Sequence, residues 1–97
     1  MYKLLLFLKK TADENILNHF KDYTVKYLAE IAKKEIKIAE VESNLLLDQK
    51  YSLYCDLEVE SKDAWDSMMN TKEGRLLNKD LMEFHQNISA VFVNYSK

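Results

Sequence analysis

Apolar side chains recur along the chain at two different spacings, and the spacing changes from one segment to the next. Residues 2–9 are apolar on both parities, which is typical of a strand covered on both faces. Between residues 15 and 33 the apolar positions recur every three or four residues and predict one amphipathic helix. Residues 51–60 alternate between apolar and polar side chains, the pattern of a half-buried strand whose Tyr51 and Leu53 point the same way.

Short polar motifs indicate where helices begin and end. Thr11 and Glu14 form a capping box, so the first helix is expected to begin at Thr11. Ser61 is expected to cap a second helix, and residues 70–74 interrupt that helix before a further helical segment. Two more strands are predicted, a weak one at residues 36–42 and the last one at residues 88–95, and residues 44–50 connect the second strand to the third.

The predicted order of elements is strand, helix, strand, strand, helix, strand. Two split βαβ units of this kind define an α+β, ferredoxin-like βαββαβ sandwich, a four-stranded antiparallel sheet with helices on one face. One domain over residues 1–97 fits the length. The first and last strands are nevertheless apolar on both faces, so we expect a second copy to cover the open face and form a dimeric α/β barrel. The side chains expected at that interface are Leu5, Phe7, Val91 and Val93, or else their neighbours of opposite parity.

Composition and charge exclude several classes of function. The chain has one glycine and no proline, so no glycine-rich phosphate-binding loop is present. Fourteen basic residues balance sixteen acidic ones, which leaves no electrostatic footprint for nucleic acid or an anionic membrane. The apolar run at residues 4–8 is too short for a signal peptide or a membrane span. The single cysteine, Cys55, fits a reducing cytoplasm.

The second half of the chain resembles a known family. Residues 56–84 resemble the dimeric α/β-barrel superfamily, and within it the EthD-type proteins, in three motifs: Ser61-Lys62-Asp63-Ala64-Trp65, Thr71-Lys72-Glu73-Gly74 and Asp80-Leu81-Met82-Glu83-Phe84. The order of elements extends the resemblance to the whole chain. It implies the fold above. Because members of this superfamily carry out many reactions, it does not settle the function.

The first helix departs from the family's pattern. EthD-like sequences often carry Phe-x-x-His-Tyr-x-x-x-His-x-Pro-Leu there, and the aligned residues keep the first histidine as His19. The second histidine is replaced by Thr24 and the proline by Lys26. The family position most suited to a catalytic base is therefore not basic. Whether the protein is an enzyme stays open; if it is, the resemblance implies a cofactor-independent oxygenase-like or isomerase-like activity.

A ligand pocket between the first helix and the sheet is the first candidate site. At about 100° per residue, Thr24 faces the sheet, and its hydroxyl with nearby phenols can orient ligand oxygens. The predicted lining is Tyr23, Thr24, Tyr27, Leu6, Cys55, Trp65 and Phe84. The alternative is that Thr24 bonds a backbone carbonyl and the tyrosines pack without a ligand. The same wheel places His19 in solvent, and a structural role is expected for Asp80 and His85.

Tyr54 and Asp56 form a second candidate. They lie on the polar parity of a strand expected at the centre of the sheet, so a dimer would partly bury them, and burial raises the pKa of a carboxyl group toward the range of a general acid or base. Thr24 joins them as a weaker catalytic candidate. The alternative is that Asp56, Glu58 and Glu60 only form hydrogen bonds across the dimer or reach water at its rim. No metal site and no cofactor are expected, because the two histidines and Cys55 lie far apart in the sequence.

Two functions from different classes remain open. The leading hypothesis is a homodimer that binds, and in one version transforms without a bound cofactor, a small hydrophobic or aromatic oxygenated metabolite. The competing hypothesis is a non-catalytic binding or assembly module in which the apolar sheet face serves dimerisation only. A closed core behind Thr24 favours the second.

Overall fold

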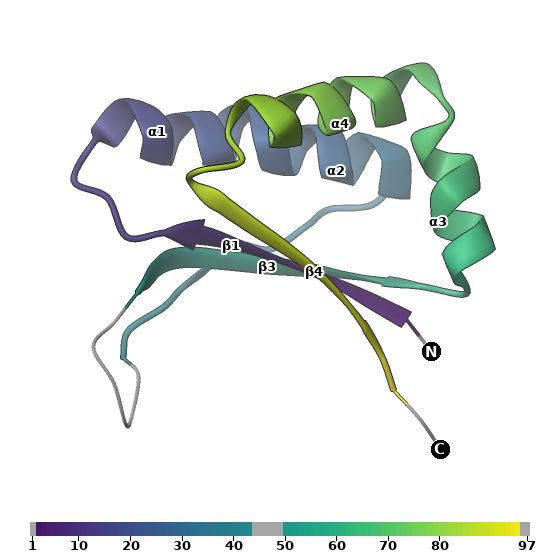
Figure 1. The fold of residues 1–97 in the computed structure, drawn as a ribbon, viewed down its shortest axis with the longest axis horizontal. Coiled ribbons are helices and arrows are strands. Elements are labelled where there is room, and N and C mark those ends of the chain that lie inside the picture. The colour runs from purple at the N-terminus through teal and green to yellow at the C-terminus, as the bar shows by residue number, and fades with distance from the viewer. Residues whose placement is uncertain (1, 44–49, 96–97) are drawn as a thin grey trace.

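A computed structural model describes residues 2–43 and 50–95. In it, four α-helices and a π-helical segment lie over one face of a four-stranded sheet, and the other face is open (Figure 1). The elements are β1 (Tyr2–Lys9), α1 (Glu14–His19), η1 (Phe20–Thr24), α2 (Val25–Ala32), β2 (Ala39–Glu40), β3 (Tyr51–Val59), α3 (Lys62–Met69), α4 (Lys72–Glu83) and β4 (Ile88–Asn94). The predicted connection at residues 44–50 falls almost entirely outside the described residues.

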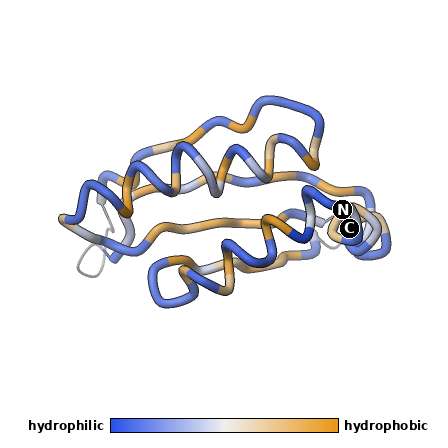
Figure 2. Tube along the Cα trace, turned by 90° about the horizontal axis from the view of Figure 1, so that it is seen from above, coloured by the Kyte–Doolittle hydropathy of each residue, from blue (hydrophilic) through white to orange (hydrophobic). Residues whose placement is uncertain are grey.

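The sheet has the order β2-β3-β1-β4, and every neighbouring pair is antiparallel. This is the predicted α+β, ferredoxin-like arrangement, and β3 lies at the centre of the sheet as expected, beside β1. Leu4 lies opposite Leu57, and Leu6 lies opposite Cys55, so two apolar rows face the helices and form the core. Hydrophobic positions are spread along the helices and the strands rather than gathered in one segment (Figure 2).

The first helix begins differently from the prediction. Asp13, not Thr11, is the N-cap: its side chain accepts a hydrogen bond from the backbone N–H of Asn15 at 2.9 Å. The Thr11 hydroxyl instead accepts from the Asp13 N–H at 3.1 Å, one step before the helix. The predicted single helix is also interrupted, because η1 separates α1 from α2. This interruption positions the candidate site described below.

The second strand is much shorter than residues 36–42. Only Ala39 and Glu40 are assigned to it, and they pair with Tyr54 and Leu53. Ile36 and Ile38 pack against the core without joining the sheet. At this edge of the sheet, tertiary packing determines which residues pair with β3. The apolar pattern of residues 36–42 alone does not predict where that strand pairing begins.

Hydroxyl side chains cap both of the helices that meet at the joint between α3 and α4. The Ser61 hydroxyl accepts from the Ala64 N–H at 3.0 Å and caps α3, as expected. The Thr71 hydroxyl caps α4 by accepting from the Gly74 N–H at 3.0 Å. Gly74 then passes so close to α3 that a Cβ at this position would lie 2.4 Å from the Met68 carbonyl oxygen. The joint therefore needs a residue without a side chain at position 74.

The open face of the sheet carries an aromatic cluster. The Phe7 ring lies 4.7 Å from the Tyr51 ring and 4.9 Å from the Tyr54 ring, measured between centroids. Tyr51 was expected to point the same way as the buried Leu53, and that prediction is wrong. The register between β1 and β3 shifts between Leu8 and Lys9, so the Tyr51 ring packs on Phe7 instead.

Candidate functional site

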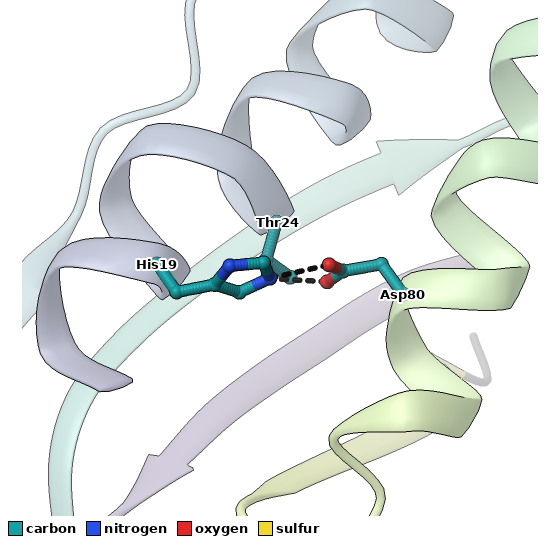
Figure 3. A network of polar contacts seen from close by, with 3 residues as sticks. All are labelled: His19, Thr24 and Asp80. Carbon is teal, nitrogen blue, oxygen red and sulfur yellow. Dashed lines mark hydrogen bonds and ion pairs between the residues drawn. The ribbon is translucent and has the colours of Figure 1, made fainter. Parts of the chain in front are cut away.

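The most tightly connected polar group in the described structure joins the first helical stretch to α4. The Thr24 hydroxyl donates to Oδ2 of Asp80 at 2.5 Å, and Nε2 of His19 lies 2.5 Å from Oδ1 of the same carboxylate (Figure 3). The Asp80 side chain is 6% exposed and that of His19 is 27% exposed. Each carboxylate oxygen thus has one partner, as a buried charge requires.

The π-helical segment makes this convergence possible. In η1 the Val25 N–H donates to the carbonyl of Phe20, five residues earlier. In a regular α-helix two residues five apart lie about 140° apart around the axis. An i→i+5 turn takes up more residues per turn, so it brings such residues closer together around the axis. His19 and Thr24 are five apart, so the π turn brings both onto Asp80.

Two interpretations made from the helical wheel therefore change. His19 was expected in solvent, but it is half-buried and bonded to Asp80. The structural alternative for Thr24 was a bond to a backbone carbonyl, whereas its hydroxyl donates to the Asp80 side chain. One signal was available in the sequence: Asp80 stands three residues after Leu77 and four before Phe84, on the apolar stripe of its helix. A carboxylate on such a stripe needs a partner across the core.

His19 also has aromatic neighbours. Its ring stacks on Phe84 with centroids 4.1 Å apart and on Tyr23 with centroids 5.1 Å apart. Within residues 2–43 and 50–95, its Nδ1 atom has no hydrogen-bond partner. An ionised carboxylate only accepts hydrogen bonds, so the tautomer that fits an ionised Asp80 carries its proton on Nε2. In that tautomer Nδ1 can accept a hydrogen bond from a ligand.

The structure does not gather the predicted pocket residues into one lining. Thr24, Leu6 and Cys55 are at most 1% exposed and pack in the core. Trp65 packs edge-on against Phe92 at 5.5 Å, whereas Phe84 stacks on His19. Tyr27 is half-buried against the core, and Tyr23 is 53% exposed.

Two surface hollows of about 670 and 690 Å³ lie beside α3. Of the predicted pocket residues, only Trp65 lines either of them.

Cys55 is chemically quiet. Burial in the core, and then the negative charge of Asp56, raise the pKa of its thiol to about 12. Since the thiolate is the reactive form, the folded protein holds almost no nucleophile at this position. In the structure Cys55 serves as a core residue.

Tyr54 and Asp56 lie together on the open sheet face, as predicted from their parity. The Tyr54 hydroxyl donates to Oδ2 of Asp56 at 2.6 Å, and the Lys3 ammonium lies 3.8 Å from the same oxygen. Partial burial, and then the bond to Asp56, raise the pKa of the Tyr54 phenol far above its usual range. Tyr54 is therefore a fixed hydrogen-bond donor rather than an acid.

The segments at residues 2–43 and 50–95 contain neither a metal-binding cluster nor a membrane-spanning helix. No group of three or more histidine, cysteine, aspartate or glutamate side chains is arranged to hold a metal ion there. No helix in those segments is long and apolar enough to cross a membrane.

Comparison with known proteins defines the class of fold. Neither a family model nor a curated protein sequence matches the chain. Among solved structures, an ethyl tert-butyl ether D (EthD) family protein from Bacillus halodurans is similar with a TM-score of 0.80 and 18% identity, over 99% of both chains. A protein from Arabidopsis thaliana follows with a TM-score of 0.60 and 16% identity, over 99% of this chain and 93% of that one.

A third similar structure bears on assembly. It is described as a dimeric protein of unknown function with a ferredoxin-like fold, from Bacteroides fragilis. Its TM-score is 0.51 at 15% identity, over 97% of this chain and 94% of that one. At these identities the comparisons establish a shared ferredoxin-like fold, the one predicted from the order of elements.

Proposed function

We propose that this protein is a homodimer that closes its open sheet face against a second copy and binds a small hydrophobic or aromatic oxygen-containing molecule without a bound cofactor. The observation that carries the proposal is the uncovered face of the sheet. All the helices within residues 2–43 and 50–95 lie on the other side (Figure 1), and in this proposal the second copy covers the open face.

The open face has the character of an interface rather than of a wetted surface. Leu5 lies between Val91 on one neighbouring strand and Asp56 on the other, and Phe7 packs between two tyrosines. Val91 is 43% exposed in the single chain. Apolar and aromatic side chains gathered in this way mark interaction surfaces, and a twofold dimer is the commonest solution for a chain of this kind. The dimeric neighbour of the same fold supports a second copy as the partner.

The ligand half of the proposal is supported where the junction of α1 and η1 meets the last turn of α4. There a half-exposed histidine, backed by a carboxylate, lies beside the exposed ring of Tyr23. A polar group converging with aromatic walls is the usual composition of a small-molecule site. Thr24, which was predicted to line the pocket, is packed in the core of the single chain, so this proposal places the ligand at the more exposed side of this junction.

The same packed interior supports the competing function, a non-catalytic assembly module. Thermal unfolding with a panel of phenols, lactones and quinones separates the two. A ligand at ten times its dissociation constant adds about 1.4 kcal/mol to the free energy of unfolding. Stabilisation by at least one compound of the panel is expected. If no compound of the panel stabilises the protein, ligand binding is contradicted and the non-catalytic assembly module is favoured.

A further inference from the structure

We infer that Nδ1 of His19 is the proton acceptor of a ligand site at the junction of α1, η1 and α4, and that the ligand is an acidic phenol or enol bound as its anion. This inference rests on the ligand-binding half of the proposed function and is independent of dimerisation. It concerns a residue that the wheel had placed in solvent. The carboxylate bonded to His19 belongs to Asp80, the most buried charged side chain among the described residues.

The orientation of the ring follows from Asp80. Thr24 already donates its hydroxyl proton to Oδ2, which requires that oxygen to be an acceptor. The other oxygen, Oδ1, faces Nε2 of His19, so the ring proton of the neutral imidazole belongs on Nε2. With its position and tautomer fixed from behind, the ring presents the lone pair of Nδ1 outward.

A structural tie between the helices does not need this histidine. The Thr24 hydroxyl alone connects η1 to the Asp80 carboxylate on α4. Adding His19 leaves a ring nitrogen without a partner among the described residues, at a side chain that is 27% exposed. The π turn that brings His19 and Thr24 together is also a rare element, and such turns are frequent at functional sites. Both features point to a group kept available for a ligand.

The neighbours of His19 select the chemical class of that ligand. Phe84 and Tyr23 stack on the imidazole, and the exposed Tyr23 ring extends the stack toward solvent. A planar aromatic or conjugated ligand can continue such a stack with its ring offset. The titratable groups in contact with His19 are Tyr23 from η1 and Asp80 from α4. Asp80 is the one carboxylate among these groups, and it contacts Nε2. An acidic hydroxyl on the ligand can therefore approach Nδ1 without meeting another of their carboxylates.

The proton balance of binding is simple. The O–H bond of the phenol or enol breaks, its electron pair stays on the ligand oxygen, and an N–H bond forms at Nδ1. The imidazolium then lies between the ligand anion and the Asp80 carboxylate, so each charge has an opposite neighbour. Charge-assisted hydrogen bonds of this kind are stronger than neutral ones.

The test uses 4-nitrophenol, whose anion is yellow and whose neutral form is nearly colourless. Titration at slightly acid pH, where the free probe is mostly neutral, is expected to give the absorbance of the anion as protein is added. His19→Gln keeps a donor for Asp80 but has no ring nitrogen to accept a proton, so it should lose the yellow signal and raise the dissociation constant at least tenfold. His85→Gln changes the other histidine, which lies on the surface near the same end of α4, and should behave as the unchanged protein.

Three results overturn the inference: no absorbance change in the unchanged protein at millimolar probe, the same anion signal in His19→Gln, or a bound probe that stays neutral. If another compound of the panel still stabilises both the unchanged protein and His19→Gln equally, ligand binding stands and only the role of His19 falls. A ¹⁵N spectrum of the imidazole adds a readout without ligand. It should show the proton of neutral His19 on Nε2, and a proton on Nδ1 contradicts the assigned orientation.

Discussion

At the scale of single residues, the buried carboxylate of Asp80 makes the largest demand on its surroundings. It is bonded by one hydroxyl and one imidazole, and it lies in a helix face that otherwise packs into the core. Removing either partner leaves an oxygen of a buried charge without a donor. The cost of such a substitution is set by the unsatisfied buried oxygen, and it exceeds the net contribution of an ordinary hydrogen bond.

Thr24→Val tests this demand, because it removes the hydroxyl at nearly constant volume. A hydrogen bond to a charged group contributes about 1.5–3 kcal/mol, so the free energy of unfolding should fall by about that amount. Thr11→Val is the control, since the Thr11 hydroxyl makes an exposed bond and its loss should cost about 0.5 kcal/mol or less. Urea unfolding at one protein concentration gives both values. Equal small losses would show that Asp80 does not depend on Thr24.

Cys55 gives a second prediction at this scale. Burial raises the pKa of its thiol to about 12, whereas an unfolded cysteine ionises near about 8.5. Between these values the folded state binds more protons, so the thiol's contribution to stability is complete below the lower value and is lost as the pH rises through this window. Iodoacetamide at pH 8 should therefore modify Cys55 only in urea. Rapid modification of the native protein would contradict the buried, protonated thiol.

At the scale of elements, the joint between α3 and α4 depends on the close approach at Gly74. Alanine in a helix is normally favoured over glycine by about 1 kcal/mol. At this position the added Cβ would meet the backbone of Met68 and Met69. Gly74→Ala is therefore expected to destabilise by about 1–3 kcal/mol, the usual cost of overpacking. Asn78→Ala, at an exposed position of α4, should leave stability within about 0.5 kcal/mol.

The same unfolding curves decide the outcome. If Gly74→Ala proves as stable as Asn78→Ala, the two helices can separate without cost and the close approach is not required. Because both substitutions lie in α4, differences in helix propensity alone would favour Gly74→Ala over Asn78→Ala. If Gly74→Ala is instead less stable than Asn78→Ala, the difference is due to the contact of position 74 with α3.

Some elements could be predicted from the sequence because their causes are local. The alternation of residues 51–60 and the capping by Ser61 arise within a few neighbouring positions, and the structure confirms both apart from the direction of Tyr51. The meeting of His19 with Asp80 could not, because it joins residues far apart in the chain. It also depends on a π turn, whereas a helical wheel assumes uniform 100° steps. The two-residue β2 likewise depends on tertiary pairing.

The candidate site shows the same division. The parity of β3 correctly placed Tyr54 beside Asp56, where a hydrogen bond joins them. The ligand pocket predicted from residues on five elements stays a prediction, because a cavity depends on how side chains from distant segments fill space. The structure divides that set between the core, the Trp65 end and the His19 end.

At the scale of the whole molecule, one question decides the account: whether a second copy covers the open sheet face. A small domain buries a limited fraction of its surface, so an uncovered apolar face weakens it further. Phe7→Asp places a charge at the centre of the aromatic cluster, where an unpaired buried charge costs several kcal/mol in a dimer. Leu76→Asp is the matched control, because Leu76 is 40% exposed on α4 and lies away from this face.

The most direct measurement is the mass of the protein in solution at micromolar concentration, by sedimentation equilibrium. The account predicts a species of twice the 11.5 kDa chain mass for the unchanged protein and for Leu76→Asp. Phe7→Asp should sediment as a single chain, folded or unfolded, and the milder Val91→Lys should shift the equilibrium in the same direction. A single 11.5 kDa species for the unchanged protein, or an undiminished dimer in Phe7→Asp, would contradict closure of the open face by a second copy.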